Sequence, residues 1–417
     1  MVEFMSERNE RKAGGAPARL FAVEMLRILA IIGIAVFHTF LPAFEGMMGR
    51  GALPMEAGVP ISAVTGSLWA AWLVAMLKFV GAWGNHVFFM ISGYFLIPRM
   101  MRSSWDGGYW RSQTRATSRR VMSVLVTVAF YTLIMLVFDR FVTPVTSAGW
   151  MQWFALGLEF IWVYVLLVAF APVLAWLLAR AARWNRKVLA CFTALVVLLV
   201  YALNAYVGFF CSSHGSFALL DWRKWMGAVS YGVSFALAGL IGCAVREAGS
   251  RADVSTRVSW RMRRGTWVLV MLVAFAALGA SVAWAVSRGD YALLYQMSFK
   301  STSVFSFVLA VGSLMFAVCG RPTVESKVSR FVQKLASGIL GFYVVQSLAG
   351  DAWKPASERA MAPFLTNAAA ASPIAHFGWI LAWLAVGIAF SVAFVVVVCV
   401  GDRLVRQPLL RAMKLIR

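Results

Sequence analysis

The chain has 417 residues, of which 61% are hydrophobic and only 13% are charged. Soluble globular proteins are nearer half apolar and a quarter charged, so this composition excludes an ordinary soluble enzyme and favours an integral membrane protein. The formal net charge of +22 is compatible with nucleic-acid binding. However, the basic residues stand between apolar blocks, so we expect no nucleic-acid partner.

Ten apolar blocks follow one another along the chain, most of them about 20 residues long, the length that crosses a bilayer as a helix. Two of the blocks, 80–97 and 331–348, are interrupted by small or polar residues. The ten blocks are 20–41, 80–97, 120–138, 153–178, 187–207, 225–244, 266–286, 301–318, 331–348 and 377–400. We predict an all-α, polytopic transmembrane bundle of about ten spans with no separate soluble domain.

The distribution of Lys and Arg predicts the orientation, because cytoplasmic loops carry the excess of both residues. With the N-terminus inside and ten spans, 29 of the 39 Lys and Arg residues fall in cytoplasmic segments and nine in outer ones. We therefore predict a basic cytoplasmic tail at 1–19, a transmembrane domain at 20–400, and a second basic cytoplasmic tail at 401–417. The expected location is the cell membrane.

Segment 61–80 is apolar enough to be an eleventh span. An extra span would move every later basic loop to the outer side. We therefore interpret it either as a helix on the outer face or as a lengthening of the second span.

The first span carries three ionisable residues, Glu24, Arg27 and His38. Ionisable groups at membrane depth are costly and are candidates for function. Arg27 and His38 are eleven residues apart, which puts them on one helix face, roughly 16 Å apart. An interfacial Arg27–Glu24 pair and a packing role for His38 are the structural alternatives.

Polar groups in later spans are predicted to lie toward the outer side, near the depth of His38. If they meet there, they would form a substrate site. These residues are His86 in the second span, Glu159, Trp162 and Tyr164 in the fourth, and Tyr343 and Gln346 in the ninth. The five cysteines are scattered without metal-ligand spacing, so we expect no metal site.

These residues resemble the membrane acyltransferase-3 family, whose members acetylate surface polysaccharides and related envelope acceptors. The family's first span has an Arg, ten residues and a His, as in Arg27 and His38, with an acidic residue at the position of Glu24. The Phe-Phe-Met-Ile-Ser-Gly-Tyr sequence at 88–94 is similar to a second-span family block. The aromatic sequence at 160–164 is similar to a fourth-span block.

The ninth span differs from the family's Ser-x-Gly-Ile-Tyr-Leu-x-His block in two ways. Extra residues separate its glycine from Tyr343, and Gln346 replaces the usual histidine. A glutamine side chain takes up no proton at neutral pH, so a second catalytic base at this position is not expected.

The resemblance implies an O-acyltransferase that moves an acyl group, with acetyl expected, from acyl-CoA to a hydroxyl of an envelope saccharide or lipid-linked acceptor. It makes His38 the general base, with Glu24 or Glu159 as orienting groups. The donor phosphates would bind four basic residues, Arg27, Arg115, Arg119 and Arg120. Positive-inside topology explains the last three of them equally well. Acyl-CoA would be a substrate, and no tightly bound cofactor is expected. A transporter or flippase of a lipid-linked saccharide is the alternative.

Overall fold

The structure, a computed structural model, describes residues 21–48, 60–141, 158–210, 222–250, 254–319 and 326–415. Every element within these ranges is a helix. The predicted tail 1–19 and the start of the fourth block, 153–157, lie outside the described residues. The helices are α2 (Phe21–Met47), α3 (Ser62–Thr65), α4 (Leu68–Ser103), α5 (Tyr109–Phe141), α7 (Glu159–Trp184), α8 (Arg186–Phe210), α9 (Trp222–Ser250), α10 (Val254–Ser287), α11 (Tyr291–Ser298), α12 (Val304–Val318), α13 (Lys327–Ala336), α14 (Ile339–Leu348), α15 (Gly350–Ala369), α16 (Pro373–Leu404) and α17 (Arg406–Ala412).

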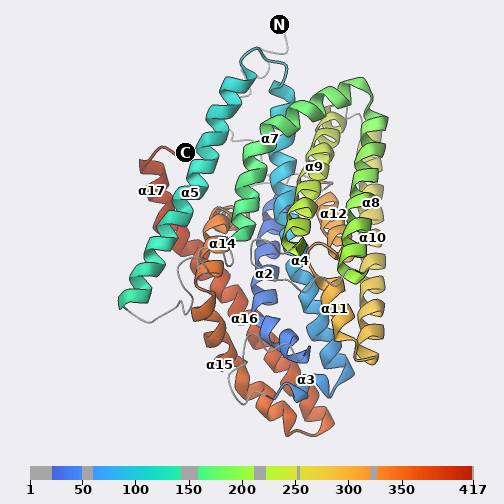
Figure 1. Ribbon diagram of the computed structural model, residues 1–417, viewed down its shortest axis with the longest axis vertical. Coiled ribbons are helices and arrows are strands. Elements are labelled where there is room, and N and C mark those ends of the chain that lie inside the picture. Colours follow the sequence, from blue (N-terminus) through green and yellow to red (C-terminus); the bar gives the residue numbers. More distant parts are fainter. Residues whose placement is uncertain are drawn as a thin grey trace.

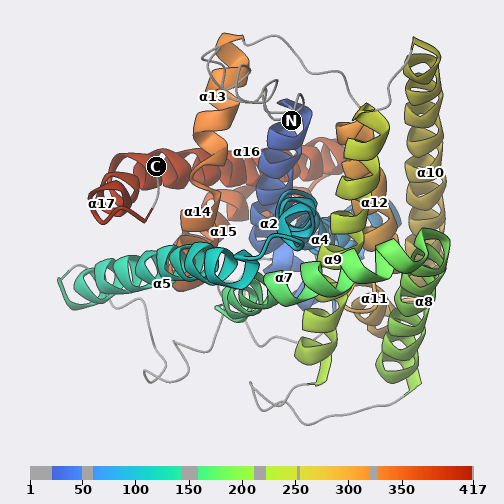
Figure 2. The same cartoon turned by 90° about the horizontal axis from the view of Figure 1, so that it is seen from above.

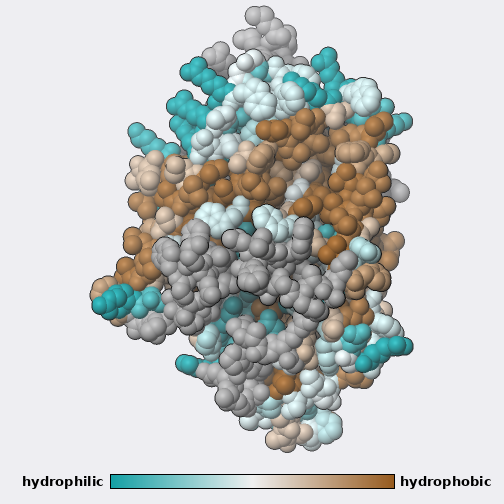
Figure 3. Space-filling model, viewed as in Figure 1, coloured by the Kyte–Doolittle hydropathy of each residue, from teal (hydrophilic) through white to brown (hydrophobic). Residues whose placement is uncertain are grey.

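Helices match all ten predicted apolar blocks. In the described part of the chain, eight helices are long and apolar enough to cross a membrane, and α12 and α14 are shorter apolar helices. Figure 3 shows a belt of hydrophobic residues across the middle of the visible face, with hydrophilic residues toward both ends. The prediction of a polytopic helical bundle is therefore confirmed.

Segment 61–80 lengthens the second span and is not an extra one. The 36 residues of α4 begin at Leu68 and continue through the predicted second block, and α3 is a single turn before it. The start of α5 and the α7–α8 junction both lie at the upper end of Figure 1, and α17 lies in the same half. These predicted cytoplasmic segments thus share one end of the bundle, and the side of the membrane stays a prediction.

The predicted ninth span is broken into two helices. It consists of α13 and α14, which are separated by Ser337 and Gly338. With ten residues, α14 is roughly 15 Å long, about half of the hydrocarbon thickness. Non-helical backbone at membrane depth is tolerated where it is buried in protein or lines a cavity, so this break marks a candidate site.

Helix α4 lies near the centre of the bundle, where it packs against α2 and α9 (Figure 2). Gly93, within the Phe-Phe-Met-Ile-Ser-Gly-Tyr block, makes the contact with α9 possible. A Cβ atom at Gly93 would lie 2.0 Å from the carbonyl oxygen of Phe235. Small residues of this kind let helix backbones approach closely in membranes, where lipid is as apolar as the side chains.

The predicted C-terminal tail is partly folded into the bundle. Helix α16 continues to Leu404, and α17 follows with Arg406, Gln407 and Leu410 buried. The basic composition of 401–417 indicated a tail because it resembled the other loops. Arg406 of this segment is a buried ion-pair partner of Asp402, and the cytoplasmic side of the segment stays a prediction.

Candidate active site

Five helices, α2, α4, α7, α13 and α14, and the break before α14 meet around a cavity of about 180 Å³ beside Arg27. Arg27 comes from α2, Phe88 and Ser92 come from α4, Tyr164 comes from α7, and Tyr343 comes from α14. Each of the blocks that resembled the acyltransferase family supplies at least one of these residues. Of the six residues that would form a substrate site, only Tyr164 and Tyr343 line this cavity, which lies beside Arg27 and does not include His38.

Two features of the helices that carry Tyr164 and Tyr343 bear on the predicted depth of these residues, which stays a prediction. Viewed from above, α4 is seen end-on whereas α7 lies lengthwise, so α7 runs obliquely through the bundle (Figure 2). Helix α14 begins only after the break at Ser337, and so its first turn already lies inside the protein. Counting residues from a span end assumes an upright, unbroken helix, and neither helix is one.

Tyr343 brings an unsatisfied polar group to the cavity wall. Its ring stacks on Phe160 with a centroid distance of 4.6 Å and meets the edge of Phe88 at the same distance. The side chain is only 4% exposed, and among the described residues its hydroxyl has no hydrogen-bond partner. A buried hydroxyl without a partner is costly, which makes it a candidate for contact with a ligand.

Arg27 pairs with Glu24, as the structural alternative predicted, and lines the cavity as well. Its Nη1 lies 3.2 Å from a carboxylate oxygen of Glu24, and its guanidinium lies 5.3 Å from the centroid of the Phe95 ring. Glu24 is bound to Arg27 through both oxygens, and it is roughly 21 Å along the helix from His38. Glu24 therefore does not orient His38, contrary to the prediction.

The three other predicted donor-binding arginines differ in position. Arg115 and Arg119 are exposed on α5, so topology alone accounts for them. Arg120 is half-buried, with one guanidinium nitrogen buried and unpaired among the described residues. Its charge acts on Tyr164, as does that of Arg27. Arg120 is thus the member of this group that belongs with the Arg27 cavity.

His38 lies in a different environment, nearer the other end of α2. The side chain is half-buried, and its Nδ1 atom is buried without a hydrogen-bond partner in the described part of the chain. The next residue, Thr39, ties α2 to α16 through a 2.8 Å hydrogen bond to Ser391. Phe37 packs against the His38 ring edge-on at 4.7 Å. The backbone is therefore fixed here while one ring nitrogen stays unpaired.

Two lysines that the sequence analysis did not select as site residues act on His38. Lys78 of α4 and Lys354 of α15 both act electrostatically on His38 and on Glu45. The ammonium group of Lys78 lies 4.8 Å from the ring centroid of Phe37 and 4.7 Å from that of Phe44. Both lysines were counted only as outer-loop charges. The sequence feature that could have identified Lys78 is its position within a long apolar stretch.

His86 has the surroundings of a packing residue. It is fully buried, and its Nδ1 is 2.9 Å from the Ser234 hydroxyl. Its Nε2 lies 3.2 Å from the Lys300 carbonyl oxygen and 3.4 Å from the Tyr201 hydroxyl. Both nitrogens thus have protein partners, so the geometry favours a structural role over the predicted contact with substrate.

The remaining predicted residues do not line the Arg27 cavity. Glu159 begins α7 and is half-buried, and Trp162 packs against the core cluster that contains Tyr343. Gln346 is 5% exposed, and its carbonyl oxygen accepts a hydrogen bond from the Trp353 indole. Their predicted contact with an acceptor stays a prediction.

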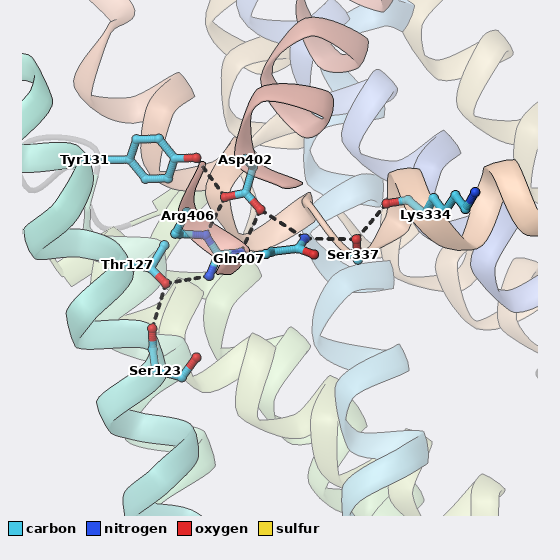
Figure 4. A network of polar contacts seen from close by, with 8 residues as sticks. All are labelled: Ser123, Thr127, Tyr131, Lys334, Ser337, Asp402, Arg406 and Gln407. Atoms are coloured by element: carbon cyan, nitrogen blue, oxygen red, sulfur yellow. Dashed lines mark hydrogen bonds and ion pairs between the residues drawn. The ribbon is translucent and has the colours of Figure 1, made fainter. Parts of the chain in front are cut away.

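A buried polar network stabilises the break between α13 and α14 (Figure 4). Asp402 of α16 forms a buried ion pair with Arg406 and accepts a 2.7 Å hydrogen bond from the Tyr131 hydroxyl. Gln407 donates to the Ser337 hydroxyl at 2.9 Å, and that hydroxyl donates to the Lys334 carbonyl at 2.6 Å. The network thus connects α5, α16 and α17 to the break that lines the Arg27 cavity.

Gly341 brings α14 against the same carboxylate. A Cβ atom at this position would lie 1.8 Å from Asp402 Oδ1. Gly341 is one of the extra residues by which the ninth span differs from the family block, and the close contact with Asp402 gives a packing reason for a glycine at this position. It lets α14, and with it Tyr343, lie directly on α16.

One comparison with known proteins finds a match. Residues 20–401 match a family model described as an acyltransferase domain, Acyl_transf_3. No curated protein and no solved structure matches the chain. The match covers α2 through nearly all of α16, so it contains Arg27, His38 and the whole cavity.

Proposed function

Because the chain belongs to the membrane acyltransferase-3 family, we propose that it transfers an acyl group, with acetyl expected, from acyl-CoA to a hydroxyl of a cell-envelope saccharide or similar acceptor. The observation that carries this proposal is the cavity in which Arg27, Ser92, Tyr164 and Tyr343 meet. A guanidinium and an unpaired phenol suit a polar, anionic donor better than they suit lipid.

Arg27 and His38 divide the work between donor binding and proton transfer. Arg27 holds the donor from the cavity side, because guanidinium pairs well with phosphate and carbonyl oxygens. His38 lies roughly 16 Å further along the same face of α2. In this proposal, the extended pantetheine arm brings the thioester from the first residue toward the second.

The reaction itself requires one base and one electrophile. A ring nitrogen of His38 takes the proton of the acceptor hydroxyl as its oxygen attacks the thioester carbonyl carbon. The carbon–sulfur bond then breaks, and the CoA thiolate leaves and takes up the proton from His38. The positive charges of Lys78 and Lys354, which act on His38, suit the oxyanion that develops on the carbonyl.

Transfer of labelled acetyl in a purified system tests the proposal. The full-length protein in vesicles is given acetyl-CoA labelled in the acetyl group together with an envelope saccharide fraction. We expect label in an alkali-labile ester on the saccharide and release of one CoA thiol for each ester formed. Movement of a lipid-linked saccharide across the vesicle membrane without ester formation would overturn the proposal in favour of a transporter.

A further inference from the structure

A second cavity, of about 520 Å³, opens among α5, α13, α14, α16 and α17 and is strongly basic. Its wall carries five cationic side chains, Arg330, Lys334, Arg403, Arg406 and Arg411. Four of them are exposed, and Arg406 is buried. The cavity thus concentrates positive charge on a surface that water and soluble anions can reach.

The charge of the four exposed cations is not neutralised within the described parts of the chain. Among these residues, Arg406 alone of the five forms an ion pair, and its partner is Asp402. Arg406 therefore forms part of the cavity floor. In the network of Figure 4 it donates a hydrogen bond to Thr127, and Gln407 donates one to Asp402, the ion-pair partner of Arg406. The other four guanidinium and ammonium groups face the cavity above a fixed floor.

The basic cavity adjoins the Arg27 cavity. Ser337 and Leu340, at the break between α13 and α14, line both of them. A ligand whose anionic end occupies the basic cavity therefore has a neighbouring site for an uncharged arm, which passes the break toward Arg27. The larger cavity carries the cationic side chains, and the smaller one next to it has polar and aromatic walls. This arrangement fits a molecule with phosphates at one end.

We propose that this basic cavity binds the phosphate groups of the acyl-CoA donor, through Arg330, Lys334, Arg403 and Arg411. The proposal rests on the function proposed above, since it names the donor's binding site. Arginine binds phosphate oxygens in a bidentate manner, and lysine adds a point charge. Anionic lipid headgroups carry the same chemistry, and the test separates these two sources of phosphate.

Another cavity with basic side chains, in the described part of the chain, provides a control. It has about 590 Å³ among α4, α7, α8 and α9, and it includes Arg102, Arg183, Arg186 and Arg246. It shares no lining residue with the Arg27 cavity. A purely electrostatic attraction of CoA or lipid to this end of the bundle would use both cavities, whereas a donor site uses only the first.

The experiment measures binding of CoA and of dephospho-CoA, which lacks the 3′-phosphate, to the full-length protein in vesicles. The test variant is Arg330→Gln with Arg411→Gln, and the control is Arg102→Gln with Arg183→Gln. All four arginines are exposed, so we expect unchanged melting temperatures. Vesicles of neutral phosphatidylcholine alone and vesicles with added anionic phosphatidylglycerol distinguish donor binding from lipid binding.

We expect the test variant to bind CoA about 10- to 100-fold more weakly than wild type, as loss of two charge-assisted contacts implies. The affinity of the control variant for CoA should stay within about threefold of wild type in both kinds of vesicle. Its arginines line a cavity that shares no residue with the Arg27 cavity, and exposed charges contribute little on their own. Wild type should prefer CoA to dephospho-CoA, and the test variant should lose that preference in both kinds of vesicle.

Three results would overturn the inference: unchanged CoA affinity in the test variant, an equal loss in the control, or a loss seen only with phosphatidylglycerol. A wild-type protein that transfers acetyl while the test variant keeps its CoA affinity removes this site and leaves the proposed function intact. A wild-type protein that binds CoA at this cavity but forms no ester removes the proposed function and leaves the site.

Discussion

The surroundings of His86 and His38 differ although both histidines lie in membrane-spanning helices. His86 is fully buried and bonds to Ser234 and to the Lys300 carbonyl. His38 is half-buried and has an Nδ1 atom without a partner among the described residues. Sequence alone made the two residues alike, since each is a histidine near the outer end of its span.

The difference between the two sites teaches how to separate structural from functional polar groups. A buried group whose hydrogen bonds are complete stabilises the fold, and its removal leaves other groups unpaired. A group held on a fixed backbone with an unused nitrogen contributes little to stability, but it is free to take a proton. We therefore expect catalysis to depend on His38 and stability to depend on His86.

The largest expected effect is on catalysis at His38. Replacing His38 with Ala should lower acyl transfer about 10²- to 10⁴-fold, the usual contribution of a positioned general base. Expression and membrane insertion should stay normal, because Nδ1 of the ring forms no hydrogen bond with the residues that the structure describes. The measurement is acetylated acceptor formed per unit of inserted protein.

The next effect is on stability at His86. Replacing His86 with Ala leaves a cavity and removes the hydrogen bonds that its ring forms with the Ser234 hydroxyl and the Lys300 carbonyl. Together these losses should lower the free energy of unfolding by about 2–4 kcal/mol. Thermal unfolding in detergent measures this loss. Transfer per folded protein should stay within about threefold of wild type, since no predicted proton transfer uses this ring. A catalytic loss at His86 as large as that at His38 would remove the distinction between the sites.

The smallest effect concerns the donor at Arg27. Replacing Arg27 with Lys keeps the charge next to Glu24 and loses the planar fork, so acyl-CoA affinity should fall about tenfold. The rate at saturating donor should change less, because His38 and the acceptor are untouched. Equilibrium binding of CoA gives the affinity, with Arg119→Lys as the control at an exposed position. Equal affinities in both variants would count against a donor role for Arg27.

The fold followed from the sequence because the bilayer sets the length of a span. All ten apolar blocks became helices, and the positions of Arg27 and His38 on one stripe followed from helix geometry. The departures have local causes. Gly338 and the preceding serine interrupt the ninth block. Helix α7 runs obliquely (Figure 2), and its residue Tyr164 lines the same cavity as Arg27.

The missed residues were charged groups that topology already explained. Asp402 and Arg406 have the i,i+4 spacing of a helical ion pair at the end of the last span, which was the available signal. That spacing does not reveal that both side chains are buried, or that Tyr131 of α5 joins them. Contacts between distant helices such as α5 and α16 depend on packing, which one sequence does not specify.

Chemical rescue of the His38→Ala protein tests the central claim most directly. Imidazole is added to vesicles containing the His38→Ala or the His86→Ala protein, and ester formation from labelled acetyl-CoA is measured. We predict a saturable increase of at least about tenfold for His38→Ala, since free imidazole replaces the missing base, and no increase for His86→Ala. Wild-type transfer by His38→Ala before any imidazole is added, or an equal response of both variants, would contradict the assignment of His38 as the general base.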